Sequence, residues 1–147
     1  ITEEAKLAAR LARGSVGRAV SINVETFRIR RDKMLGVLRG AIQGRDLPSM
    51  LRTAEEINDA KNKEHFEEYL DILESLIHDV WSLRIADDST RVVNTDVSAE
   101  LSLIARDAAN AELPGWLAAI EEMREQFAVN INRKVATDAL FVSMATV

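Results

Sequence analysis

Cysteine is absent from this chain of 147 residues, which excludes a disulfide framework and any zinc site made of thiolates. Prolines and glycines are few, two and six respectively, so little interrupts helix formation. The net charge is −5, whereas a free-standing nucleic-acid-binding protein usually has a basic excess. No apolar run approaches the roughly 20 residues of a membrane-spanning helix. With 47% hydrophobic and 29% charged residues, the chain is expected to be a soluble globular protein.

Motifs for catalysis and cofactor binding are missing as well. A phosphate-binding loop needs glycines followed by Lys-Ser or Lys-Thr, and the sequence has no such run. A di-iron site in a helical bundle needs two Glu-x-x-His pairs, but Asn62 and Ser75 stand three residues before the two histidines, His65 and His78. No nucleophile elbow is present. We therefore expect no enzyme activity, no cofactor and no metal.

Hydrophobic periodicity predicts an all-α protein, a bundle of about seven or eight helices. The expected helices cover about 2–13, 15–23, 24–43, 46–60, 62–86, 96 or 98 to 109, 113–129, and 130 or 132 to 147. Asp46 has the side chain of an N-cap, with Pro48 in the first turn that follows. The clearest apolar stripe has helical spacing and consists of Phe66, Tyr69, Leu70, Leu73, Leu76, Ile77, Val80 and Trp81.

Charged and small residues allow more than one reading. Four neighbouring basic residues fit either a phosphate-binding patch or a mixed-charge exposed face, and we interpret them as the latter: Arg28, Arg30, Arg31 and Lys33. Paired acidic residues, such as Glu67-Glu68, are interpreted in the same way. Gly36 and Gly40 leave open whether two helices approach closely there.

The stretch RGSVGRAVSI, residues 13–22, places a glycine inside the first turn of a helix. Gly14 fits the position after one helix end and Ser15 the N-cap of the next, but Gly17 costs that helix roughly 0.5–1 kcal/mol relative to alanine. The stretch resembles the Gly-Ser turn that opens the last lid-domain helix of AAA+ clamp-loader subunits. In ATP-binding members the resemblance implies a phosphate-contacting arginine at the position of Gly17. The delta-prime type has glycine there, although it usually has proline where this chain has Val16.

Three later stretches resemble the same delta-prime family of bacterial DNA polymerase III clamp loaders, in the same order. LIHDVWSL at 76–83 resembles the helix before the family's variable loop, and VVNTDVSAEL at 92–101 its Asn-x-Asp entry to the next helix. MREQFAVNINRKVATDALFVSM at 123–144 resembles the family's ending, with Phe127 where leucine is usual. The resemblance covers nearly the whole chain.

This resemblance implies two parts and an assembly function. Residues 1–22 are expected to be the end of the AAA+ lid domain, and residues 24–147 the helical collar domain. In the family, the collars of five subunits form a ring, and the complex loads the sliding clamp on DNA during replication. The chain begins with Ile1 rather than methionine, and we expect it to be part of a longer protein.

The expected partners are delta and gamma/tau-type subunits in a cytoplasmic hetero-pentamer. The resemblance implies no direct nucleotide binding, no membrane, and DNA contact that is indirect or weak. DNA-directed DNA polymerase activity belongs to the parent complex. Two alternatives remain: the collar region of an ATP-hydrolysing gamma/tau-type paralogue, which Gly17 disfavours, and an unrelated helical adaptor or an enzyme whose site forms only in three dimensions.

The last predicted helix is apolar on two sides. On a helical wheel, Val135, Ala139 and Val142 share one side with Ile131 beside them. We predict that this side packs into the bundle and that the opposite side meets a neighbouring subunit; the alternative is that this helix is the central one of the bundle. The predicted interface residues are Ala136, Leu140, Phe141, Met144 and Val147.

Overall fold

The computed structural model describes residues 24–44, 46–86, 91–127 and 132–146 of the chain. The α-helices in these ranges are α2 (Val24–Arg39), α3 (Leu47–Ile57), α4 (Phe66–Ala86), α5 (Ser98–Asp107), α6 (Leu113–Phe127) and α7 (Arg133–Ala145). The described ranges contain no strand, so the all-α prediction is confirmed. Six helices are described rather than seven or eight, and the helices expected at 2–13 and 15–23 lie outside the described residues.

Local sequence signals set several helix boundaries. The Asp46 side chain accepts a hydrogen bond from the Ser49 N–H at 3.2 Å and caps α3, whose first turn contains Pro48. Asn132 caps α7 in the same way, accepting from the Val135 N–H at 3.1 Å. Short 3₁₀ turns lead into α4 and α5, and a π-helical turn over Gly40–Gly44 prolongs α2. The predicted cap of α3 is therefore confirmed, and of the two starts expected for the last helix, 130 or 132, the structure has the second.

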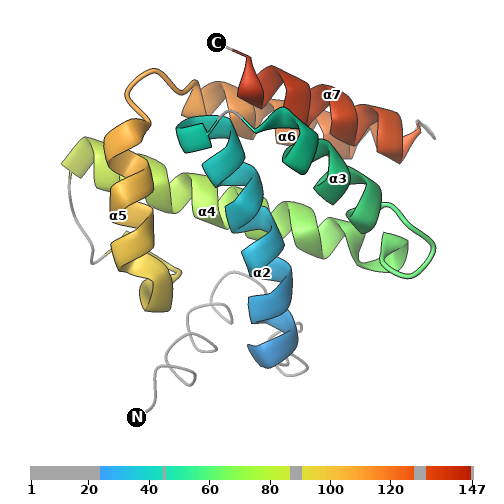
Figure 1. Cartoon of the computed structure of the whole chain (residues 1–147), viewed down its shortest axis with the longest axis horizontal. Coiled ribbons are helices and arrows are strands. Elements are labelled where there is room, and N and C mark those ends of the chain that lie inside the picture. The colour runs from blue at the N-terminus through green and yellow to red at the C-terminus, as the bar shows by residue number, and fades with distance from the viewer. Residues whose placement is uncertain (1–23, 45, 87–90, 128–131, 147) are drawn as a thin grey trace.

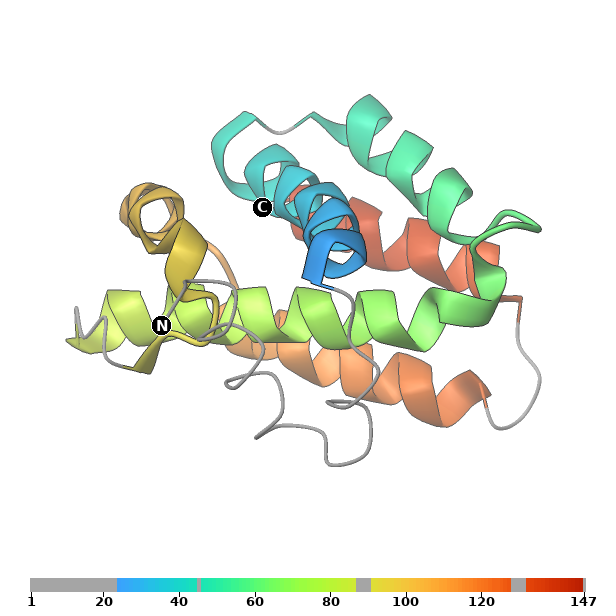
Figure 2. The ribbon, with the colours of Figure 1, turned by 90° about the horizontal axis from the view of Figure 1, so that it is seen from below.

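Helix α4 is the axis about which the other helices are arranged (Figure 1). Helix α2 crosses over its middle, and α5 lies across its C-terminal end. Helix α6 runs along α4 in the opposite direction, as the view from below shows (Figure 2). Helix α7 packs between α3 and α6, near the top of the view in Figure 1. This arrangement surrounds α4 with apolar neighbours.

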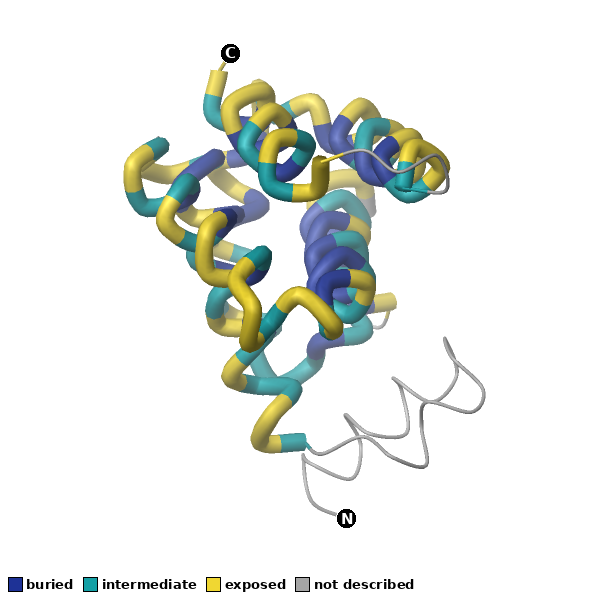
Figure 3. Tube along the Cα trace, turned by 90° about the vertical axis from the view of Figure 1, so that its right-hand side faces the viewer, coloured by how far each residue is buried: buried dark blue, intermediate teal, exposed yellow. Residues whose placement is uncertain are grey.

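The apolar stripe of α4 forms the centre of the core, as predicted. Seven of its eight residues are buried, Leu73 and Ile77 completely, while Trp81 is half-buried. Helices α2, α5 and α6 pack directly against α4, α7 packs against α3 and α6, and the exposed positions form the outer surface (Figure 3). Among the described helices, none has both the length and the apolar character that crossing a membrane requires.

The two glycines of α2 and its π-helical extension have different roles. A Cβ at Gly40 would lie 2.9 Å from Met50 Cγ of α3, so Gly40 allows α3 to approach closely. A Cβ at Gly36 would meet nothing within 4 Å. Close helix approach therefore explains Gly40, whereas packing does not explain Gly36.

Candidate functional site

Helix α7 presents one face to the core and another to solvent, and the assignment is the reverse of the prediction. Leu140, Phe141 and Met144 are only 5%, 1% and 2% exposed, whereas Val135 and Val142 are 62% and 40% exposed. Three residues predicted to meet a neighbouring subunit thus lie in the chain's own core. Of the other two, Ala136 is half-buried against the same core, and Val147 lies outside the described residues.

The sizes of the side chains explain this orientation. Leucine, phenylalanine and methionine bury more apolar area than two valines and an alanine, so turning the larger set inward gives the greater hydrophobic stabilisation. The buried face also contains Thr137, whose hydroxyl donates to the Arg133 carbonyl at 2.7 Å and accepts from Asn58 Nδ2 at 3.2 Å. Because its hydrogen bonds are made, this polar residue does not prevent burial.

The outer face of α7 is a stripe of exposed, uncharged residues: Val135, Ala139, Val142 and Ser143, continued by Thr146. Its charged border is the pair of Lys134 and Asp138, whose Nζ and Oδ2 atoms are 2.6 Å apart. The two helices beside α7 differ, because their exposed positions are rich in charge. These are Arg52, Glu55 and Glu56 on α3, and Glu121, Glu122 and Glu125 on α6. An uncharged stripe between charged neighbours is typical of a contact surface.

Aromatic contacts hold the start of α7 in place. The guanidinium of Arg133 lies over the rings of Phe66 and Phe127, at 5.8 and 5.6 Å from their centroids. These two rings meet edge to face, with centroids 5.2 Å apart. Helices α4, α6 and α7 therefore meet at one point, which fixes how the outer face of α7 is presented.

A buried polar network, which the sequence did not reveal, joins α2 to the segment before α5. Arg31 is 2% exposed and donates to both carboxylate oxygens of Asp96, at 2.8 and 2.5 Å. It also donates to Asn94 Oδ1 at 3.3 Å. Burial acts to raise the pKa of Asp96, but the hydrogen bonds and charge of Arg31 lower it below its ordinary value. The interpretation of Arg31 as part of an exposed face is therefore wrong, because an acidic partner 65 positions away allows its burial.

Asp79 of α4 supports the same network from the other side. Its carboxylate accepts from the N–H groups of Val93 and Asn94, at 2.8 and 2.9 Å, and from Asn94 Nδ2 at 2.8 Å. Burial raises the pKa of Asp79, although these hydrogen bonds act to lower it. The Asn-Thr-Asp stretch singled out in the sequence thus fastens the chain to α4 through Asn94 and to α2 through Asp96.

Arg124 of α6 forms ion pairs with carboxylates of α4. Its guanidinium donates to Glu67 at 2.7 Å, to Asp71 at 2.8 Å, and to Glu74. Burial and a hydrogen bond with Glu121 raise the pKa of Glu74, while the hydrogen bond and charge of Arg124 lower it; the net shift is upward. These carboxylates therefore join α4 to α6 through one arginine.

The remaining polar groups do not converge on a reaction centre within the described ranges. No group of three or more potential metal ligands occurs there. The other three residues of the predicted basic cluster contact carboxylates, Arg28 with Asp96, Arg30 with Glu68, and Lys33 with Glu56, as expected of a mixed-charge face. Gly17 lies outside the described residues.

Two open hollows are shallow. One, of about 440 Å³, lies between the end of α2 and the start of α3 and is lined by Arg39, Gln43 and Ser49 among others. The second, of about 230 Å³, lies beside Trp81 and Pro114. The first hollow also contains Asp46, whose carboxylate caps α3. The outer face of α7 is therefore the candidate functional site.

Comparison of the chain with models of protein families, with curated proteins and with solved structures finds no match.

Proposed function

We propose that this chain is the collar region of a delta-prime-type subunit of a bacterial DNA polymerase III clamp loader. Its role is assembly: it holds its subunit in a cytoplasmic complex with delta and gamma/tau-type subunits, which loads the sliding clamp during replication. The four stretches that resemble the family, beginning with RGSVGRAVSI, support this proposal. The all-helical architecture agrees with it.

One structural observation carries the proposal, namely the outer face of α7. Val135 and Val142 are exposed on a helix whose opposite face is already buried, so the bundle itself does not need them. Burying two valines against a partner removes apolar area from water, which stabilises a complex. The proposed subunit contact therefore moves from Leu140 and Met144 to the opposite side of the same helix.

The charges beside this face give the contact its selectivity. Helices α3 and α6 flank α7 and have charged residues at exposed positions, so a partner that covers the outer face of α7 and reaches these helices must present complementary charges around an apolar centre (Figure 1). Charge pairs at the rim of an interface contribute more to the choice of partner than to affinity. Different rims on different subunits would then set their order in a ring.

Reconstitution tests the proposed assembly function. The chain is mixed with the delta-type and gamma/tau-type subunits encoded in the same genome, and the mass of the products is measured by size-exclusion chromatography with light scattering. The proposal predicts a complex that contains the chain together with both subunit types. Elution of the chain as a separate peak at micromolar concentrations would contradict it.

Calorimetry distinguishes the delta-prime type from the ATP-hydrolysing alternative. Because Gly17 has no side chain to contact phosphate, the chain is expected to bind neither ATP nor ADP at micromolar concentrations. Saturable binding that is lost on removing residues 1–22 would favour a gamma/tau-type subunit instead.

A further inference from the structure

The two halves of α2 are held in the protein by different forces. From Met34 onward the helix and its extension bury apolar side chains: Met34, Leu35, Val37, Leu38 and Ala41. In the first half, residues 24–33, Arg31 is the single buried residue, while Phe27 is half-buried and Ile29 is exposed. Figure 1 shows this half extending beyond α4, away from α3 and α7. The apolar core therefore anchors the second half of α2 far more than the first.

Charged contacts hold the first half. Arg31 makes two hydrogen bonds to Asp96, and Arg28 Nε lies 3.5 Å from the same carboxylate. On the other sides of the helix, Arg30 pairs with Glu68 of α4, and Lys33 Nζ lies 3.5 Å from a carboxylate oxygen of α3. The Arg31 pair is nearly withdrawn from water, so solvent and salt weaken it less than an exposed pair.

The acceptor of these contacts is itself fixed to α4. Asn94, two residues before Asp96, is fully buried and accepts from Arg31 through Oδ1. Its Nδ2 group donates to Asp79 and to Ser75, both on α4. The position of Asp96 is thereby determined by the middle of α4, and through Arg31 it determines the position of α2.

We propose that Arg28, Arg31 and Asp96 form an ionic clasp that sets the direction in which the first half of α2 leaves the bundle. The clasp acts on a part of the helix that the apolar core holds only through the half-buried Phe27, so the direction of α2 can be changed without unfolding the bundle. The clasp thereby sets where the N-terminal end of α2, at Val24, lies relative to α4. This inference holds whichever partner the outer face of α7 binds.

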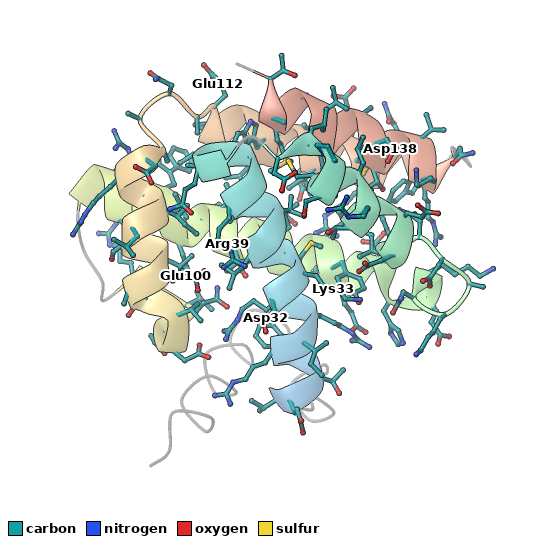
Figure 4. All side chains as sticks on the ribbon, in the orientation of Figure 1. Asp32, Lys33, Arg39, Glu100, Glu112 and Asp138 are labelled. Carbon is teal, nitrogen blue, oxygen red and sulfur yellow. The ribbon has the colours of Figure 1, made fainter. Side chains whose placement is uncertain are left out.

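Hydrogen exchange on the Asp96→Asn variant tests the clasp. The amides of residues 28–33 are expected to exchange about tenfold faster or more, because a buried charged hydrogen bond is weakened, while residues 34–41 change by about twofold at most. The matched control is Glu100→Gln, which removes the exposed pair between Arg39 and Glu100 on the second half of α2 (Figure 4). This control is expected to change exchange by about twofold at most in both halves.

Every outcome of this experiment decides the proposal. A selective rise at residues 28–33 supports it. An equal rise in both halves would show that the pair does not act on the first half alone. No change in exchange at residues 28–33 would show that the pair does not hold the first half. Global loss of protection in Asp96→Asn would show that the pair holds the whole bundle, and would equally overturn the proposal.

A distance measurement tests the predicted change of direction. Because the chain has no cysteine, spin labels can be attached at Glu25→Cys on α2 and Glu122→Cys on α6, both exposed positions. The distribution of distances between the labels is expected to be broader with Asp96→Asn than without it, and unchanged with Glu100→Gln. Equal distributions in all three proteins would contradict the clasp.

Discussion

At the scale of single residues, Asn94 connects two helices through its side chain. It is fully buried, and its side chain joins Arg31 of α2 to Ser75 and Asp79 of α4. The sequence singles out the Asn-Thr-Asp stretch through its family resemblance, but it does not show these partners. The reason is that the partners Asp79, Ser75 and Arg31 lie 15, 19 and 63 positions away along the chain, and such pairs are set by tertiary packing.

The cost of losing Asp79 measures the strength of this network. Asp79→Ala leaves three donors without their acceptor: the N–H groups of Val93 and Asn94 and the Asn94 side-chain amide. We expect the free energy of unfolding to fall by about 3 kcal/mol, measured by urea denaturation. Asp107→Ala, at an exposed carboxylate that accepts from Gln43, is the control and is expected to cost about 0.5 kcal/mol or less. Equal effects would contradict the role of Asp79.

The pH dependence of stability reports on Asp96. Its pKa in the folded protein lies below the ordinary value of 3.8, so the folded state binds fewer protons than the unfolded state near that pH. The stabilisation from ionised Asp96 is therefore present above pH 3.8 and is lost as the pH falls through the folded pKa. We expect the wild-type advantage over Asp96→Asn, measured by urea denaturation, to shrink from about pH 5 to about pH 2. A constant difference across this range would contradict the assignment.

At the scale of helices, sequence patterns predict where a helix begins and ends better than which of its faces packs against the core. The cap Asp46, the stripe around Leu73 and a last helix starting at 130 or 132 are predicted from the sequence, because each depends on neighbours within about four positions. The orientation of α7 was predicted the wrong way round. Both of its faces are apolar, and a helical wheel that counts apolar residues does not weigh Leu140 and Phe141 against Val135 and Val142 by size.

Two glycines of the α2 segment provide a matched pair of substitutions. Gly36→Ala is expected to stabilise the protein by roughly 0.5–1 kcal/mol, because it adds a better helix former where a Cβ has free space. Gly40→Ala is expected to lower stability, since its Cβ would lie 2.9 Å from the buried Met50. Thermal unfolding followed by circular dichroism measures both. Equal shifts of the two melting temperatures would show that packing at Gly40 is not close.

The two faces of α7 can be compared in the same way. Replacing both Leu140 and Met144 with Gln is expected to reduce the free energy of unfolding by about 4 kcal/mol or more, because polar amides would enter the core. Replacing both Val135 and Val142 with Gln is expected to change it by about 1 kcal/mol or less, since these side chains are exposed. Urea denaturation measures the two values, and the reverse order would contradict the orientation of the helix.

At the scale of the whole molecule, the protein has an apolar core around α4 and two surface features outside that core. Helix α4 organises the core, the outer face of α7 has exposed valines, and the clasp on Asp96 holds the first half of α2. The class of fold follows from the sequence pattern. The positions of these two surface features do not follow from the sequence pattern, because they depend on which helices lie side by side.

The most direct test of the account is the affinity of the chain for the proposed partner subunits when lysines are placed on the outer face of α7. Val135→Lys combined with Val142→Lys is compared with wild type by sedimentation velocity in the presence of delta-type and gamma/tau-type subunits. Ile29→Lys on α2, another exposed apolar position, is the control. We predict that the double variant keeps its melting temperature but binds about a hundredfold more weakly, because unpaired charges would enter the contact, while the control binds as wild type. Wild-type affinity in the folded double variant would contradict the central claim.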